Sequence, residues 1–547
     1  MQSSISDLTT ETRSTRGSVP PPLVGASMTI VGDAMYVFGG RLVASRQMTN
    51  HLYILNLTTL VWERHIGPPG SAPPPPSRYF HSTNVYRDSF LVVFGGMGPA
   101  FSSSATQEQG DLCALDDICL FDLSSLSWHY PHISPSLYTP QARYAHLAEC
   151  FDDKFLVIGG QDMANQYINE INVYDLKVGA WVQGESVDQH YGAYRAVAFC
   201  PRRPLGNNHD DDTGTLCIYS NYNFTNVTRS LLSCRPLHDR PVTFKDHSNA
   251  MSGTVLPPGL RFPSSHILGH HLILTGTFLT PTHCAFHIWA MNLSTLAWMR
   301  IDTGSSSSGS WNRSVLDSRQ QKLYVVGNQA RNILEDYNLR QINFDHVAIV
   351  DLEAFGIYTP PHYAPNAQEL GLSMLNEPSL ADMHIMSTDR HSIPVNSAIL
   401  AQRWSYFAKR IMPDLQQQQQ ARRILQFTEP YTVTLAFLQY LYTDGLFTAQ
   451  QHQPGVLARL LILAHMFDMP RLVQLTTHAL HQLLTVTTAS LVYETAALTC
   501  RTALQIRALR VMINARKMIQ QVASKHAASP LPLDLMAQQQ SPMALRF

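Results

Sequence analysis

The sequence predicts a multidomain protein with an all-β region of about six repeated four-stranded units, followed by an α/β, mainly helical region. Three observations support this prediction. A β-rich run ending in a glycine pair recurs along the first two thirds of the 547-residue chain, and a tryptophan motif recurs in phase with it. After the proline-rich stretch 359–368, strand-like runs give way to apolar residues at helical spacing.

The clearest copy of the repeat runs from Phe151 to Trp181. Residues 154–158 are mostly β-branched or aromatic, which is typical of a buried strand. The pair Gly159-Gly160 allows a turn in which a Cβ atom would clash. Asp175 opens a second turn by accepting bonds from the amides that follow it. Trp181 supplies a large apolar area that can seal one unit against the next.

The glycine-ended strand recurs six times. Its copies are AMYVFGG (34–40), FLVVFGG (90–96), KFLVIGG (154–160), LCIYSN (216–221), HLILTGT (271–277) and KLYVVGN (322–328). The tryptophan motif has four clear copies: LNLTTLVW (55–62), FDLSSLSW (121–128), YDLKVGAW (174–181) and MNLSTLAW (291–298). A fifth, VDLEAFGI (350–357), has Ile357 at the tryptophan position, and Phe244 is a candidate substitute in the fourth unit.

These units resemble kelch repeats, in which each repeat forms one four-stranded blade of a β-propeller. The resemblance implies a six-bladed propeller over about 19–362, preceded by a disordered tail at 1–18. Two inserts interrupt the pattern, Gly98–Asp116 and Pro201–Thr213. The second contains an acidic run, but its spacing does not fit a calcium loop, so we expect a solvated loop there.

The second region resembles a BTB (POZ) domain over 379–485. The residues that carry the resemblance are ADMHI (381–385), IPVNSAILAQRWSYF (393–407), FTEPYTVTLAFLQYLYTDG (427–445) and LLILAHMFDMPRLVQLTTHAL (460–480). Asn396 and Trp404 depart from the family pattern. We expect a linker at 363–378, a short helical extension at 486–522 and a disordered tail at 523–547.

Composition narrows the function classes. Charge is balanced, with 39 basic and 40 acidic residues, which gives no electrostatic case for nucleic acid or an anionic membrane as partner. The longest apolar runs are too short for a membrane span, and the N-terminus does not resemble a secretory signal. The eight cysteines are scattered. We therefore expect a cytoplasmic protein, with a nuclear location left open, and neither an enzyme nor a cofactor or metal site.

In four of the units, an arginine precedes the glycine of the strand copy at a similar distance. In the kelch family this position often lies near one mouth of the central channel, so Arg78, Arg143, Arg261 and Arg313 are candidate partner-binding residues. A ring of guanidinium groups would suit a segment carrying carboxylates or phosphates. The alternative is structural: the arginines pair with acidic neighbours or pack under Tyr79 and Tyr144.

The two resemblances together imply a protein-interaction adaptor whose propeller binds a protein partner and whose BTB domain mediates assembly, plausibly as a homodimer. Chains of this kind are often substrate adaptors of cullin-3 ubiquitin ligases, and Asp414 and Leu415 are the candidate cullin contacts. Cullin-binding domains usually carry a hydrophobic-x-Glu triplet there, whereas this chain has Leu415-Gln416-Gln417.

The domain order, kelch first and BTB last, resembles the leucine-zipper-like regulators and the fungal kelch–BTB proteins tied to Ras signalling. A scaffold in a small-GTPase or cell-polarity pathway, without a ubiquitin-ligase role, is therefore the alternative function. A copper oxidase built on the propeller is a remote third.

Overall fold

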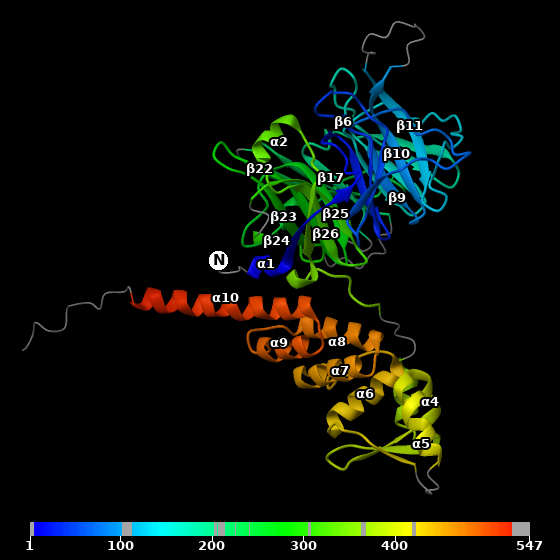
Figure 1. The fold of residues 1–547 in the computed structure, drawn as a ribbon, viewed down its shortest axis with the longest axis vertical. Coiled ribbons are helices and arrows are strands. Elements are labelled where there is room, and N and C mark those ends of the chain that lie inside the picture. Colours follow the sequence, from blue (N-terminus) through cyan, green and yellow to red (C-terminus); the bar gives the residue numbers. More distant parts are fainter. Residues whose placement is uncertain are drawn as a thin grey trace, which may run out of the picture. The chain divides into compact units, whose positions relative to one another are not determined.

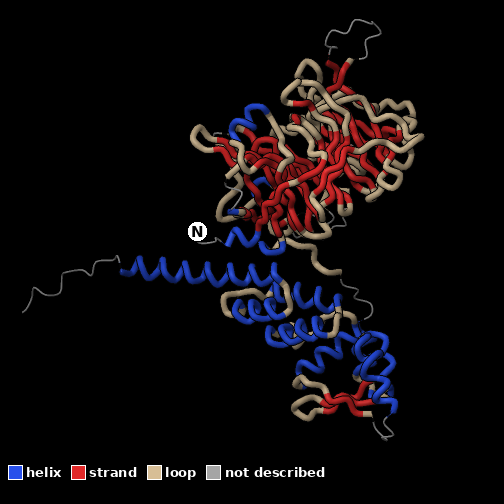
Figure 2. Tube along the Cα trace, viewed as in Figure 1, coloured by secondary structure: helices blue, strands red, loops and turns tan. Residues whose placement is uncertain are grey.

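The computed structural model describes residues 5–100, 112–201, 205, 214–224, 226–239, 241–304, 308–362, 368–417 and 423–527. Most of the two inserts and of the Gln416–Gln420 tract therefore lie outside the described residues. The chain divides into two compact units, Met1–Thr359 and Pro360–Phe547. Strands dominate the first unit and helices dominate the second (Figure 2).

The first unit contains six sheets of four or five strands within the described residues, and these are the predicted blades (Figure 1). Each of the first five blades contains four strands that follow one another in the chain. The first two blades consist of β4(Ser27–Val31), β5(Ala34–Phe38), β7(Leu52–Asn56) and β8(Val61–Arg64), and of β9(Ser82–Tyr86), β10(Phe90–Pro99), β11(Leu112–Asp122) and β12(Ser127–His129). The third, fourth and fifth blades consist of β13(Leu147–Phe151), β14(Lys154–Ile158), β15(Glu170–Asp175) and β16(Ala180–Ser186); of β17(Ala196–Phe199), β18(Leu216–Tyr222), β19(Thr228–Cys234) and β20(Lys245–Asp246); and of β21(Leu260–Leu268), β22(His271–Leu279), β23(Cys284–Asn292) and β24(Ala297–Ile301).

The sixth blade combines both ends of the unit. Its strands are β25(Ser310–Asp317), β26(Lys322–Asn328), β27(His346–Asp351) and β1(Thr10–Ser14). The first strands of the blades contact one another in the order β4, β9, β13, β17, β21, β25 and back to β4. This closed cycle makes the unit a six-bladed propeller whose first strands surround the axis.

We expected a disordered tail at 1–18. That expectation is wrong for the residues that form α1(Ile5–Thr9) and strand β1 and for those that follow them. Strand β1 pairs antiparallel with β27, from Thr10 opposite Val350 to Ser14 opposite His346. Strand β2(Arg16–Gly17) adds to the outer edge of the first blade beside β8. The tail is polar because it forms an outer edge, and its pairing depends on residues more than 300 positions away. Local composition does not reveal that partner.

The predicted tryptophan seals lie between blades, as expected. Trp181, on the outer strand of the third blade, is 2% exposed and packs edge to face on Phe94 of the second blade, with ring centroids 5.5 Å apart. Trp128 packs likewise on Phe38 at 4.9 Å, and Trp298 packs on Tyr219 at 5.4 Å. At the weaker positions Ile357 is fully buried, and Phe244 packs against the cluster between the third and fourth blades.

The second unit is a small sheet covered by helices. Its strands are β28(Met383–Met386), β29(Ser392–Val395) and β30(Ile424–Gln426), with β28 in the middle. Its helices are α3(Gln368–Leu375), α4(Ser397–Arg403), the π-helical turn Phe407–Ile411, α5(Met412–Gln417), α6(Tyr431–Thr443), α7(Pro454–Met466), α8(Pro470–Gln482), α9(Ala489–Leu498) and α10(Thr502–Ala527). The order and type of these elements confirm the predicted α/β, mainly helical domain and its helical extension.

Both departures from the BTB pattern have a local structural role. The side chain of Asn396 accepts bonds from the amides of Ala398 and Ile399, so it caps the N-terminus of α4. Trp404 is 1% exposed and stacks among aromatic rings, including Phe437 at 5.2 Å and Phe467 at 4.9 Å. A large ring is tolerated there because the surrounding core is itself aromatic.

Two predicted boundaries are wrong. The linker predicted at 363–378 contains α3, whose Leu375 belongs to the core of the second unit, so residues 368–375 are part of the folded domain. The tail predicted from 523 begins no earlier than 528, since α10 continues to Ala527. No helix among the described residues is long and apolar enough to cross a membrane.

Candidate partner-binding face of the propeller

Two sets of loops lie at the same end of the propeller. The first strand of each blade begins opposite the end of the second strand, as in the pairing of Ser82 with Phe94. Loops that enter a blade and loops that join its second and third strands therefore share one end. Helix α2(Ile333–Leu339) lies in such a loop, between β26 and β27, and Figure 1 draws it at the upper end of these strands. We call this the entry face.

Backbone hydrogen bonds connect neighbouring blades at the entry face. The amide of Phe80 donates to Gly25 O at 2.8 Å, and the amide of Ala145 donates to Phe80 O at 2.9 Å. The series continues from Ala193 to Ala145 O and, in the next blade, from Phe262 to Tyr194 O at 3.0 Å. These residues precede or begin the strands that surround the axis, so the links fix the loops around the channel mouth.

Two of the four predicted binding arginines have a structural role. Arg78 is fully buried and forms a bidentate pair with Asp117, at 2.8 and 2.7 Å. Arg143 is also fully buried, and it donates to Glu170 at 3.0 Å and to Gly159 O at 3.1 Å. Their guanidinium groups tie the entry loop of a blade to its second and third strands. At these two positions the structural alternative holds, because each arginine pairs with a carboxylate of its own blade and is not available to a ring of binding residues.

Arg313 lies apart from the other predicted arginines. It is the fourth residue of β25, one of the strands around the axis, and no described residue forms a hydrogen bond with its guanidinium. Burial lowers its pKa. Glu149, on β13 of the opposite blade, is similarly enclosed, and burial raises the pKa of its carboxyl to about 8. These two groups line the axis rather than the entry face.

An aromatic cluster covers part of the entry face beside the fourth, fifth and sixth blades. Tyr194 packs edge to face on Phe262 at 4.9 Å and on Phe224 at 5.7 Å between ring centroids. Phe262 also faces Tyr337 of α2 at 6.4 Å, and the hydroxyls of Tyr194 and Tyr337 lie 3.3 Å apart. All four side chains are partly exposed. They come from four different segments, so the cluster exists only in the closed propeller.

Three arginines lie over these rings. Arg261 places its guanidinium carbon 4.2 Å from the centroid of Phe224, Arg195 lies over the same ring at 5.3 Å, and Arg340 lies over Phe262 at 5.8 Å. No carboxylate among the described residues forms an ion pair with any of them. The Nε atom of Arg195 is buried and has no hydrogen-bond partner.

We call this set the aromatic–arginine face. Its residues are Tyr194, Arg195, Phe224, Arg261, Phe262, Tyr337 and Arg340. Arginine and aromatic residues are the types most enriched in the energetic centres of protein interfaces. Three guanidinium groups without carboxylate partners also give the surface positive charge and many unused donors. The arrangement can therefore receive an acidic segment of another protein, with the rings supplying apolar contact.

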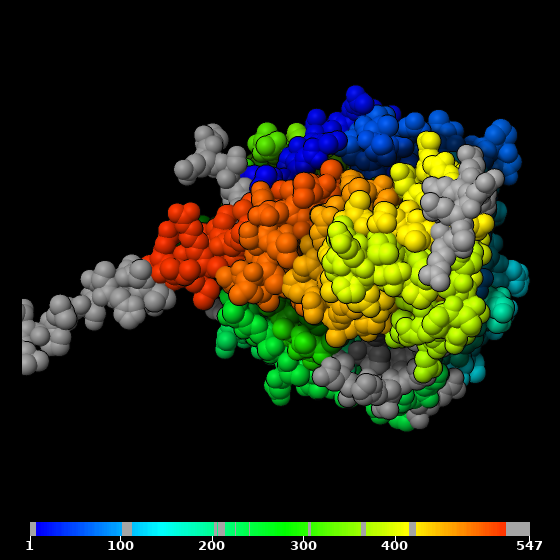
Figure 3. Space-filling view, turned by 90° about the horizontal axis from the view of Figure 1, so that it is seen from below, coloured from blue at the N-terminus to red at the C-terminus, as the bar shows by residue number. Residues whose placement is uncertain are grey.

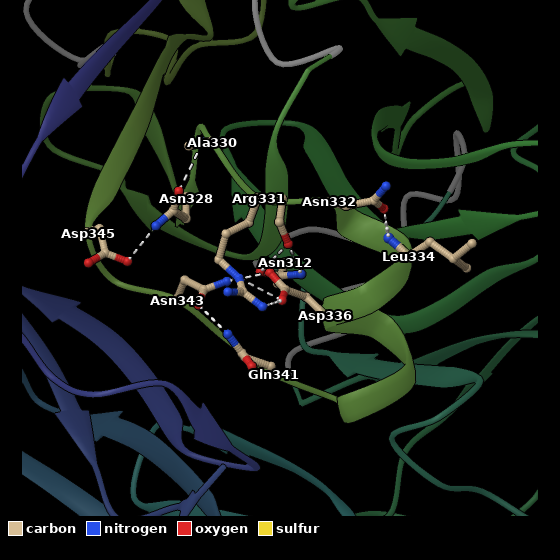
Figure 4. Close-up of polar contacts among 11 residues, drawn as sticks. Asn312, Asn328, Ala330, Arg331, Asn332, Leu334, Asp336, Gln341, Asn343 and Asp345 are labelled. Atoms are coloured by element: carbon tan, nitrogen blue, oxygen red, sulfur yellow. Dashed lines mark hydrogen bonds and ion pairs between the residues drawn. The ribbon is translucent and has the colours of Figure 1, made fainter. Parts of the chain in front are cut away.

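A buried carboxylate holds α2 in place (Figure 4). Asp336 is fully buried and accepts bonds from Arg331 Nε at 2.9 Å, Arg331 Nη2 at 2.6 Å and Asn343 Nδ2 at 2.6 Å. Gln341 in turn donates to Asn343 Oδ1 at 2.6 Å. Asn332 caps the helix by accepting from the amide of Leu334. The network fixes the helix that carries Tyr337 and ends at Arg340.

The predicted cullin contacts lie in the second unit. Asp414 is an exposed residue in the first turn of α5, and Leu415 follows it in the same helix. In the described part of the chain, no group of three or more His, Cys, Asp or Glu side chains is arranged to hold a metal ion.

Comparison with known proteins places both regions in families. Residues 3–185 match the family model described as the KLHDC2/KLHL20/DRC7 Kelch-repeats domain, and residues 372–484 match the BTB/POZ domain. The chain is 31% identical to protein ral2 of Schizosaccharomyces pombe over 577 aligned positions, which cover 90% of this chain and 92% of that protein. The chain belongs to the ral2 family. The alignment covers most of this chain, in which the kelch match and the BTB match both lie.

Two other relatives match only locally. The chain is 30% identical to the leucine-zipper-like transcriptional regulator 1 homologue of Drosophila melanogaster, over 26% of this chain and 14% of that protein. It is 32% identical to tip elongation aberrant protein 1 of S. pombe, over 30% of this chain and 13% of that protein. The first of these matches agrees with the resemblance to leucine-zipper-like regulators seen in the sequence.

The sequence indicated one residue of the aromatic–arginine face, Arg261, and missed the other six. Arg195 and Tyr194 precede a strand that lacks the clear repeat pattern, and Arg340 and Tyr337 belong to a helix inside a blade. One available signal was ILEDYNLR (333–340), a stretch of helix-forming residues between the second and third strands of the sixth blade.

Proposed function

We propose that this ral2-family protein is a non-catalytic adaptor whose aromatic–arginine face binds an acidic segment of a protein partner and whose BTB domain mediates assembly. The supporting observation is the set of three arginines over partly exposed rings, without carboxylate partners among the described residues. A carboxylate arriving from outside would receive charge-assisted hydrogen bonds that the chain itself does not use.

The rigidity of the entry face supports this function. Backbone hydrogen bonds between blades and the Asp336 network hold the binding residues before a partner arrives. Preorganised side chains lose less conformational entropy on binding, so more of the contact energy contributes to affinity. A positive surface also steers an acidic partner and makes its association sensitive to salt.

The pathway is part of the same proposal. We place the protein in small-GTPase or cell-polarity signalling, on the strength of its ral2-family membership and of the local similarity to a protein named for tip elongation. The BTB domain would bring two chains or a further component together around the captured partner.

Assembly with cullin-3 is the second candidate, and the exposed position of Asp414 on α5 is the observation in its favour. The missing acidic triplet at Leu415-Gln416-Gln417 argues against it. A pull-down of the full chain with the purified N-terminal domain of cullin-3 separates the two candidates. Binding that Asp414→Lys abolishes would support the cullin assembly, and no binding at micromolar concentration would leave the scaffold without a ligase role.

The capture of a partner is tested by affinity purification of the full chain from its native cell, followed by mass spectrometry. Arg261→Ala with Arg340→Ala should remove the specific partner while the melting temperature stays within a degree or two. Arg319→Ala is the matched control, because Arg319 is 64% exposed and lies in the β25–β26 hairpin at the opposite end of the blade. Partners retained equally by both variants would contradict the proposal.

A further inference from the structure

Helix α10 has a charge distribution that the balanced composition of the whole chain conceals. Its 26 residues contain five basic side chains and no acidic one. The basic residues are Arg507, Arg510, Arg516, Lys517 and Lys525. Since the chain carries −1 overall, the remainder carries −6. Positive charge is therefore concentrated in one helix of a protein that is otherwise acidic.

The first half of α10 is part of the folded module. Leu504 and Ala508 are fully buried, and the helix packs against α9. Arg507 donates to the ring of His481 at 2.8 Å and to the carbonyl of the same residue at 3.1 Å. These contacts hold the helix to the domain by its N-terminal turns.

The apolar stripe of α10 continues beyond this packing. With a period of 3.6 residues, the positions of Leu504 and Ala508 continue through Val511, Ala515 and Met518. Residues 516–520 are all exposed, and Met518 and Ile519 are 67% and 68% exposed. The C-terminal part of the helix forms the red surface in Figure 3. The stripe thus continues into residues 516–520, whose side chains meet solvent.

Basic residues lie beside the exposed stripe and opposite it. At 100° per residue, Arg516 falls about 40° beyond Met512, at one edge of the stripe. Lys517, which is exposed, projects from the opposite face. Long basic side chains in such positions can reach phosphate groups while the apolar side chains enter the boundary with the acyl chains.

We propose that the C-terminal half of α10 lies on an anionic lipid bilayer and attaches the protein to its surface. Charge complementarity identifies the occupant, because an extended sheet of phosphates suits a helix whose charged residues are all basic. A second copy of the helix would place like charges together. The acidic remainder of the chain is repelled by the same surface, so the attachment would also orient the molecule.

Vesicle co-sedimentation of the full chain tests the proposal. Phosphatidylcholine vesicles with and without phosphatidylserine are compared at low and high salt. Binding is expected only with phosphatidylserine and should weaken at high salt. Lys517→Glu should reduce it at least five-fold, because each basic side chain near an anionic surface contributes about that factor. Met518→Ser with Ile519→Ser should also reduce binding.

Lys245→Glu is the matched control, since Lys245 is an exposed lysine of the propeller and its reversal changes net charge equally. It should bind vesicles like the wild type. Circular dichroism verifies that the variants keep their helix content. Absence of binding to phosphatidylserine vesicles at low salt would overturn the proposal, as would equal losses for Lys245→Glu and Lys517→Glu. Capture of an acidic protein through α10 in place of vesicles would assign the helix to a protein partner instead.

Discussion

Replacement of Asp336 by alanine should release α2 without unfolding the propeller. The carboxylate accepts three side-chain bonds, two from Arg331 and one from Asn343. Asn343 is 1% exposed, so its amide would lose its acceptor inside the protein, which costs about 1–3 kcal/mol. Arg331 is 39% exposed and can recover part of its loss from water. The sum is about 3 kcal/mol, or roughly a hundredfold more frequent opening of the helix.

Hydrogen exchange of the full chain measures this opening directly. The amides of 333–340 should exchange about a hundredfold faster in Asp336→Ala, while those of β26 and β27 stay protected. Partner capture should fall as well, because Tyr337 and Arg340 lose their fixed positions. Glu335→Gln is the control on the same helix, since Glu335 is exposed. Unchanged exchange in α2, or equal deprotection of the whole sixth blade, would refute the role assigned to the network.

Three further predictions concern the propeller itself. Trp181→Ala should lower the free energy of unfolding by about 3–5 kcal/mol, as measured by chemical denaturation. Val178 lies in the same blade and is 67% exposed, so Val178→Ala should change that free energy by less than about 0.5 kcal/mol. Equal effects of the two substitutions would contradict the sealing role of Trp181. Deletion of residues 5–14 should expose the edge of β27 and promote aggregation, measured by light scattering, and a monodisperse variant with unchanged melting temperature would count against closure by β1. The pKa of Glu149 is raised from 4.5 to about 8, so the folded state keeps a proton that the unfolded state releases, and stability should fall as pH rises from about 5 to 8. Glu149→Gln should flatten that dependence in thermal melts, and an unchanged slope would show that Glu149 is not its source.

The repeat made the propeller predictable because its signals are local. A glycine with positive φ, such as Gly159 at 62°, is required where an added Cβ would meet the carbonyl of Tyr191 at 2.3 Å. A buried tryptophan at a fixed offset is required where two blades meet. The glycine pair is complete in three blades and the tryptophan is present in four, and weaker copies of the same strand mark the remaining blades, so the number of blades follows from the repeat.

The closure of the propeller and the identity of its binding residues were harder to predict, because both depend on contacts between distant segments. Strand β1 finds its partner in β27, and nothing in the first 18 residues indicates that pairing. Arg78 and Arg143 occupy the position expected for binding residues, yet Asp117 and Glu170 neutralise them. Sequence spacing identifies an arginine at the entry of four blades, but whether a carboxylate reaches it depends on the third strand.

The aromatic–arginine face was also hard to predict from the sequence, because it depends on the relative positions of distant segments. Its aromatic rings lie in the loops of separate blades, and its arginines are distinguished only by the lack of an acidic neighbour in the described chain. A sequence does not show which arginines lack an acidic neighbour in the folded protein. The face emerges only after the loops are placed around the channel mouth.

The central claim, that this face captures the partner, is tested most directly by hydrogen exchange of the full chain with and without the captured protein. The partner should slow exchange of the backbone amides at 194–195, 224, 261–262 and 333–340, and the protection should weaken as salt is raised. Protection confined to the opposite end of the blades, such as the hairpin at 318–321, or to the second unit alone would contradict the claim.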